Sequence, residues 1–228
     1  MRFSLCAAEY CFQQNALLES YFGAGNTIPI LRGSGLNQPF LLGFARKVAA
    51  GRWVHIFPEG GVFQNDDIGS FRTPAAAAVN GKLKWGVAKL IAHAPIRPIV
   101  IPYIHLGMEK VIPLNPVDRN VEKWFPTPGN SIEVSFGKEI KFDDLLIEHE
   151  KVHGTLWTYS SSSHKELSQN YENIGLDNWI SKPSDCLLYH KITCRIESEL
   201  SGLQKAAISK RQKKENSGSL VDKQILSN

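Results

Sequence analysis

The sequence lacks several features that would assign it to a class at once. No apolar run approaches the roughly 20 residues that a transmembrane helix needs. The apolar fraction, 43% of 228 residues, is ordinary for a globular protein and too low for a multispanning one. The N-terminus shows neither the apolar stretch of a signal peptide nor the Arg- and Ser-rich pattern of a transit peptide. These absences leave a peripheral association with a membrane open.

Metal-binding and redox cysteine patterns are also lacking. The chain has four cysteines, and no two of them form a CxxC pair or part of a zinc-finger pattern: Cys6, Cys11, Cys186 and Cys194. We therefore expect reduced thiols in a reducing compartment rather than a disulfide or a zinc site.

Length and composition predict one main domain with additions. The net charge of +4 suits anionic partners without requiring nucleic acid. We expect an α/β domain over residues 1–150, a Ser-rich flexible insert over 151–185, a last helix of the domain over 186–208 and a disordered basic tail over 209–228. The tail is either a solvated face or a contact for anionic lipid headgroups.

The stretch from Trp53 to Gly60 organises the chain. Its apolar residues, bounded by breakers, predict a buried strand of an α/β sheet. Pro58 fixes the backbone where the strand ends, Gly60 allows a turn, and Glu59 is left at the sheet edge where open α/β sheets bind ligands. Glu59 is thus a candidate site residue, although many acidic residues at strand ends only cap the next helix.

A second apolar run, Ile28 to Gly33, repeats this order of strand, charge and glycine. Between the two runs, residues 40–50 have the periodicity of an amphipathic crossover helix, which implies parallel strands. The predicted fold is α/β, with a mixed, largely parallel sheet flanked by helices. Further strands are expected at 3–8, 98–104 and 131–137, and helices at 16–22, 82–93 and 141–150. In the helix over 82–93, Lys82, Lys84 and Lys89 are expected to face solvent or an anionic surface.

Taken together, four blocks resemble the glycerolipid acyltransferase superfamily, and within it the tafazzin family. The blocks are residues 28–33, 53–60, 84–91 and 98–108, and the segment 1–6 is also similar to a stretch inside such chains. The resemblance covers roughly residues 1–150 and the helix after 186. The FPEG tetrapeptide alone would be weak evidence, whereas the ordered set is specific.

The resemblance implies acyl transfer to a hydroxyl of a lysophospholipid. In such proteins a histidine acts as general base, and an aspartate five positions later orients it. None of the seven histidines of this chain is followed by aspartate at that spacing. They are His55, His93, His105, His149, His153, His164 and His190. The resemblance places the dyad before the segment that matches residues 1–6. We therefore expect this chain to lack that block, through a truncated gene model, an isoform or a true loss, and we assign no catalytic residue.

The resemblance also implies which residues bind the acceptor. Arg32 and Gly33 match the second family block, and Phe57, Pro58, Glu59 and Gly60 match the third; both blocks help to hold glycerol and phosphate. The physical reason is that a guanidinium binds phosphate bidentately, while a carboxylate accepts a glycerol hydroxyl. The alternative for Arg32 is a surface ion pair.

Three neighbouring positions carry weaker expectations. Gly61 and Val62 stand where many members have threonine and arginine, so a second phosphate contact is in doubt. His55 and His105 match histidines of tafazzin-like chains and are expected to be core or supporting residues.

By resemblance, the expected function is phospholipid–lysophospholipid transacylation in cardiolipin remodelling, without metal or cofactor. The expected partners are phospholipid and lysophospholipid substrates and an anionic membrane, with no nucleic acid. The family setting is a mitochondrial membrane, bound peripherally, and Trp124 and Phe125 are a candidate contact with it. Two alternatives stay open. One is an inactive remnant that binds lipid headgroups, and the other is an acyl-CoA-dependent lysophospholipid acyltransferase.

Overall fold

A computed structural model describes residues 1–12, 15–61, 64, 82–115, 125–156 and 179–225, with side chains described up to residue 214. The chain divides into two compact units. The first holds β1–β3, α1–α3, α5, α7 and the start of α9 as far as Cys194. The second holds β4, β5, α6 and α9 from Arg195 onward. The prediction of a mixed α/β fold with a parallel sheet flanked by helices is confirmed.

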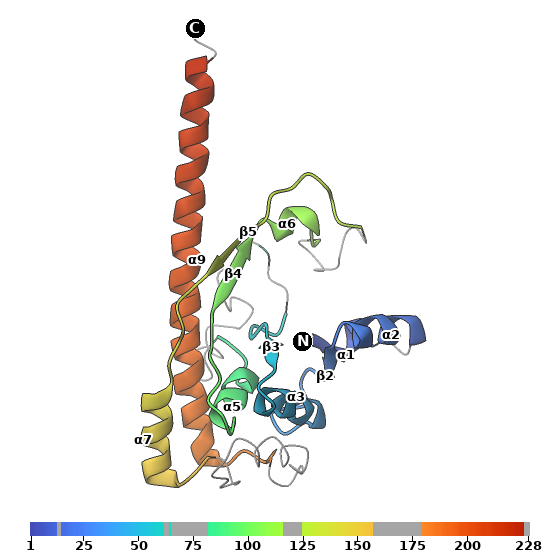
Figure 1. Ribbon diagram of the computed structural model, residues 1–228, viewed down its shortest axis with the longest axis vertical. Helices are drawn as coiled ribbons and strands as arrows, with labels where there is room; N and C mark the ends of the chain where they lie inside the picture. Colours follow the sequence, from blue (N-terminus) through green and yellow to red (C-terminus); the bar gives the residue numbers. More distant parts are fainter. Residues whose placement is uncertain (13–14, 62–63, 65–81, 116–124, 157–178, 226–228) are drawn as a thin grey trace. The chain divides into compact units, whose positions relative to one another are not determined.

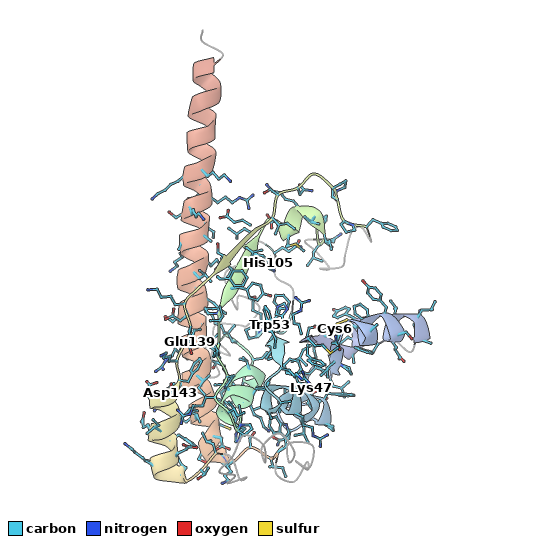
Figure 2. The ribbon with its side chains drawn as sticks, viewed as in Figure 1. Cys6, Lys47, Trp53, His105, Glu139 and Asp143 are labelled. Carbon is cyan, nitrogen blue, oxygen red and sulfur yellow. A yellow bond between two sulfur atoms is a disulfide. The ribbon has the colours of Figure 1, made fainter. Side chains whose placement is uncertain are left out.

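The first unit is built on a three-stranded parallel sheet in the order β2-β1-β3. β1 spans Arg2–Ala7, β2 spans Thr27–Ile30 and β3 spans Trp53–His55. The predicted parallel direction is confirmed. The two strands on which the prediction rested do not pair with each other, because β1 lies between them. In Figure 2, Cys6 marks the central strand and Trp53 the start of β3.

Helix α3, Pro39–Ala49, is the crossover between β2 and β3. Its buried face forms the core together with α5 (Gly86–Ala92), Trp179 and one face of the sheet (Figure 1). The periodicity of residues 40–50 predicted this helix within one residue. The buried members of the core are Leu41, Leu42, Phe44, Ala45, Leu90 and Trp179, with Phe3, Leu5, Ile28, Ile30, Val54 and Ile56 packed against them.

The buried strand predicted over 53–60 is shorter and more exposed than expected. β3 ends at His55, and Trp53 and Phe57 are 73% and 54% exposed. The breakers explain the early end, because Pro58 cannot donate a ladder hydrogen bond and Gly60 adopts a positive φ of 75°.

Two short helices follow β1. They are α1, Ala8–Cys11, and α2, Ala16–Ala24, whose N-cap Asn15 accepts from the amides of Leu17 and Leu18. A disulfide joins Cys6 to Cys11, visible as the yellow bond beside the Cys6 label in Figure 2. This corrects the expectation of reduced thiols for that pair. The turn from β1 into α1 brings the two Cα atoms within 6.2 Å, a separation that a disulfide can bridge.

Lys89 corrects a second expectation. It lies on α5 with 1% of its surface exposed, whereas the sequence pattern placed it toward solvent or an anionic surface. Its ammonium donates to the carbonyl oxygens of Leu36 and Trp179 and to Oδ1 of Asn37, and it lies 4.2 Å from the centre of the Trp179 ring. Each of the three N–H donors of the ammonium has an acceptor, and these hydrogen bonds offset part of the free-energy cost of burying the charge.

The second unit contains an antiparallel pair of strands. β4 (Tyr103–Leu106) pairs with β5 (Glu133–Phe136), and α6 spans Met108–Val111. β4 begins later than the predicted strand at 98–104, because Pro98 and Pro102 interrupt the ladder there. Gly107, at φ 98°, starts α6 where an added Cβ would lie 2.3 Å from the carbonyl oxygen of Ser131.

Two helices complete the described chain. α7 covers Asp143–His153, and α9 runs from Pro183 to Ile225. α9 thus includes residues 209–225, for which a disordered tail was predicted. The reason is local, since helix formers such as lysine and glutamine are frequent in this stretch and it contains no proline. The predicted Ser-rich insert falls largely outside the described residues. In the part of the chain that is described, no helix combines the length and hydropathy of a membrane span.

Candidate acceptor-binding site

The predicted site residues follow β2 and β3 at the carboxyl edge of the parallel sheet. Ser4 of β1 pairs with both Thr27 and His55, so these three residues are level across the sheet. Because strands lie about 4.8 Å apart, β2 and β3 are separated by about 10 Å. The positions five residues past this level row are Glu9, Arg32 and Gly60.

Arg32 is held at this edge by the helix that follows β1. Its Nε forms an ion pair with a carboxylate oxygen of Glu9, and its Nη2 donates to the Tyr10 hydroxyl at 3.2 Å. The guanidinium also lies 5.0 Å from the centre of the Tyr10 ring. Glu9 and Tyr10 raise the pKa of Arg32 above its usual range through these hydrogen bonds. The surface ion pair considered as the alternative for Arg32 is therefore present.

The ion pair leaves Arg32 able to meet a ligand. A guanidinium has five N–H donors in a fixed fork, and the contacts with Glu9 and Tyr10 use two of them. The side chain stays 45% exposed. Gly33, the next residue, has a φ of 84°, a backbone conformation that favours glycine.

The Phe57–Gly60 turn is fixed by the segment that enters α5. The amide of Lys84 donates to the Pro58 carbonyl at 2.8 Å, and the Gly60 amide donates to the Phe57 carbonyl at 3.4 Å. The Lys84 side chain covers Gly60 so closely that an added Cβ would lie 2.9 Å from Lys84 Cε. Glu59 is half-buried between exposed Phe57 and exposed Gly60. The turn therefore places the half-buried Glu59 carboxylate directly before Gly60, whose positive φ favours glycine.

The structure thus brings the two predicted loops to the same edge, on either side of β1, and adds two residues that the sequence did not indicate. These are Glu9 and Tyr10, the direct partners of Arg32. Nothing in their local sequence marks them. Only the register of β1 between β2 and β3 shows that they lie beside Arg32.

The two histidines given a supporting role differ in their settings. His55 is half-buried at the end of β3, with its ring 4.6 Å from that of Phe57. His105 is exposed on β4, in the second unit, so it is not a core residue.

A separate polar cluster lies inside the first unit, where α5, α7 and α9 meet. His93 Nε2 is 2.6 Å from the Tyr189 hydroxyl and 3.8 Å from Asp185, which also contacts His149 at 3.3 Å. Burial lowers the pKa of His93, while Asp185 opposes the shift. Burial raises the pKa of Tyr189. Among the described residues, no group of three or more side chains could hold a metal ion.

Comparisons with known proteins give the relatives of the chain. No family model matches the chain. The N-acylphosphatidylethanolamine synthase of Arabidopsis thaliana is 37% identical over 148 residues, which cover 64% of this chain and 48% of that protein. Tafazzin of Drosophila melanogaster is 32% identical over 151 residues, covering 66% and 35%. The Dictyostelium discoideum protein named taffazin is 29% identical over 182 residues, covering 77% and 57%.

The chain therefore spans about half the length of these curated relatives. The likeness nevertheless recurs across plant, insect and amoeba, and it covers 66% of the chain in the insect comparison and 77% in the amoebal one. Over about two thirds of its length, this chain is therefore similar to proteins named tafazzin and to an N-acylphosphatidylethanolamine synthase.

Proposed function

We propose that this chain supplies the acceptor-binding part of a phospholipid acyltransferase. The observation that carries the proposal is the placement of the Arg32–Gly33 loop and the Phe57–Gly60 turn at one carboxyl edge of the parallel sheet. The Arg32 guanidinium would hold the phosphate, and Glu59 would accept a hydrogen bond from the glycerol of the lysophospholipid. A span of about 10 Å between the two outer strands suits a headgroup together with its glycerol.

The reaction we propose is transacylation in cardiolipin remodelling. The acceptor hydroxyl attacks the ester carbonyl of a donor phospholipid, a new ester forms, and the donor leaves as its lysophospholipid. A base must take the hydroxyl proton, and the chain contains no histidine with aspartate five positions later. We therefore expect residues 1–228 to bind lysophospholipid with little or no turnover. The family resemblance and the tafazzin relatives support this proposal.

The relative from Arabidopsis favours a second candidate, transfer of an acyl chain to the amine of phosphatidylethanolamine. A half-buried carboxylate such as that of Glu59 would pair with an ethanolamine ammonium as readily as with a hydroxyl. The same edge of the sheet would serve both acceptors, and the products differ in one bond, an amide in place of an ester.

The acyl donor and the membrane setting belong to the same proposal. Acyl-CoA is the alternative donor to phospholipid. The proposed setting is peripheral contact with an anionic membrane, by family resemblance the mitochondrial one. Exposed lysines on α9 support an electrostatic contact: Lys205, Lys210, Lys213 and Lys214. Phe125 is 85% exposed, as a bilayer contact requires, and Trp124 lies outside the described residues.

An acyl-transfer assay tests these alternatives. Purified chain is incubated with monolysocardiolipin or phosphatidylethanolamine and with radiolabelled phosphatidylcholine or acyl-CoA as donor. Mild alkaline methanolysis then distinguishes an ester product, which is cleaved, from an amide product, which survives. We expect binding of the acceptor without labelled product. Sustained transfer by this chain would contradict the expectation of no turnover, and an alkali-stable product would favour N-acylation.

A further inference from the structure

The loop that carries Arg32 and Gly33 is fastened by a buried amide side chain. Gln38, only 7% exposed, accepts from the Leu31 amide at 3.0 Å through Oε1. Its Nε2 donates to the Leu31 carbonyl at 3.2 Å and to the Gly35 carbonyl at 2.9 Å. Gln38 thereby closes both ends of the turn around Arg32. Although it is the N-cap residue of α3, its side chain makes no capping bond and serves the loop instead.

The far end of the same loop is fastened by Lys89. Its ammonium donates to the Leu36 carbonyl at 3.1 Å and to Asn37 Oδ1 at 2.8 Å, with the Trp179 carbonyl as the third acceptor. Asn37 Oδ1 also accepts from the amide of Ser181 at 3.1 Å. The loop end is thus tied to α5 and to the segment before α9.

The residues leading into α5 also fasten the second candidate loop. Lys84 donates its amide to Pro58 and lays its side chain over Gly60, and Lys89 follows five residues later. One short segment therefore holds the Phe57–Gly60 turn at one end and the Arg32 loop at the other. All these contacts lie within the first unit.

We propose that Gln38 and Lys89 are positioning residues, which set where Arg32 and Gly33 stand relative to the Phe57–Gly60 turn. The expected effect of these residues on ligand binding rests on the proposed acceptor-binding function. Their effect on the position of the loop does not. Neither residue touches the expected ligand. Each would act through the backbone of the loop, because a headgroup bound at two loops needs both held at a fixed separation.

Amide hydrogen exchange on the full chain tests the positioning directly, without any ligand. In Gln38→Leu, which removes all three side-chain hydrogen bonds, we expect exchange at Leu31 to rise at least tenfold while the β1 amides Ser4–Cys6 change less than twofold. Gln38→Glu keeps the acceptor for the Leu31 amide but cannot donate to the Leu31 and Gly35 carbonyls, so exchange at Leu31 should rise less than in Gln38→Leu. Unchanged exchange at Leu31 in Gln38→Leu, or an equal rise at all amides, would overturn the proposal.

Binding of a soluble short-chain lysophosphatidylethanolamine, measured by calorimetry at pH 7, tests the consequence. We expect Gln38→Leu and Lys89→Met to weaken binding at least tenfold, and Lys89→Arg to recover part of the loss. The control is Leu146→Ala, which removes a buried side chain from α7 in the same unit. It should lower the unfolding temperature and leave the Kd unchanged.

The two measurements separate two failures. If wild type and Arg32→Ala bind the lysophospholipid equally, the proposed function fails while the exchange data still decide the positioning. If Leu146→Ala weakens binding as much as Gln38→Leu does, loss of stability explains the effect, and the positioning role is overturned. Where Lys89→Met does not fold, the two Gln38 variants carry the test.

Discussion

Glu9 is the residue that competes with a ligand for Arg32. The pair is exposed on both sides, so it contributes at most about 1 kcal/mol. Glu9→Gln should therefore strengthen lysophospholipid binding by up to about fivefold, because the guanidinium no longer faces a carboxylate. Arg32→Lys should weaken binding by about tenfold, because lysine keeps the charge but loses bidentate geometry. Calorimetric titration checks both, and weaker binding in Glu9→Gln would contradict the assignment.

The buried ammonium of Lys89 should make the stability of the fold depend on pH. Burial lowers its pKa to about 8, while an unfolded lysine titrates near 10.4. The folded chain therefore holds fewer protons between these values, and stability falls as the pH drops from about 10 to 8 and then levels off. In urea unfolding, wild type should gain on the order of 2 kcal/mol relative to Lys89→Met between pH 8 and 10. If the difference in unfolding free energy between wild type and Lys89→Met stays constant from pH 8 to 10, Lys89 is not desolvated in the folded chain.

The polar cluster where α5, α7 and α9 meet is expected to make the stability of the fold sensitive to acid. Burial lowers the pKa of His93, so the folded chain keeps it neutral where an unfolded histidine, with a pKa near 6.5, gains a proton. The stability it contributes is present above pH 6.5 and is lost as the pH falls through the folded value. Urea unfolding from pH 7.5 to 5 should show a shallower loss in His93→Asn than in wild type.

The matched control for His93 is His105→Asn, since His105 is exposed on β4. We expect its pH profile to follow that of wild type. An unaltered profile in His93→Asn would mean that other groups dominate the acid response.

The sequence pattern predicted some features of the helices correctly and others wrongly. Periodicity located α3 within one residue and predicted a helix over 82–93, of which α5 forms Gly86–Ala92, because an apolar stripe indicates a helix with one buried face. Periodicity wrongly placed Lys89 toward solvent. Its burial depends on carbonyl acceptors from Leu36 and Trp179, which are distant from it in the sequence, so the local pattern could not predict it. The Cys6–Cys11 disulfide was missed for a related reason: it depends on the turn from β1 into α1.

The candidate site was predictable only in part. The charged residue and glycine after each strand are visible in the sequence, and the parallel direction places both loops at one edge. That β1 stands between them, bringing Glu9 and Tyr10 to Arg32, depends on strand order, which residue patterns do not encode.

For the whole molecule, the membrane contact proposed above rests on the exposed lysines of α9. We expect co-sedimentation with vesicles of phosphatidylcholine and 20 mol% cardiolipin to weaken steeply with salt. Lys213→Glu with Lys214→Glu should reduce binding at least tenfold, because each basic residue near the surface is worth about 1 kcal/mol. The control pair Lys138→Glu with Lys151→Glu changes the charge equally and should have a smaller effect. Salt-independent binding would point to apolar insertion instead.

An NMR titration of the labelled chain with a soluble lysophosphatidylethanolamine tests the acceptor site directly. We expect saturable shifts at the amides of Gly33 and Gly60, little change at Val134 of β5, and loss of these shifts in Arg32→Ala. The absence of binding, or shifts that avoid both glycines, would contradict the assignment of this sheet edge as the acceptor site.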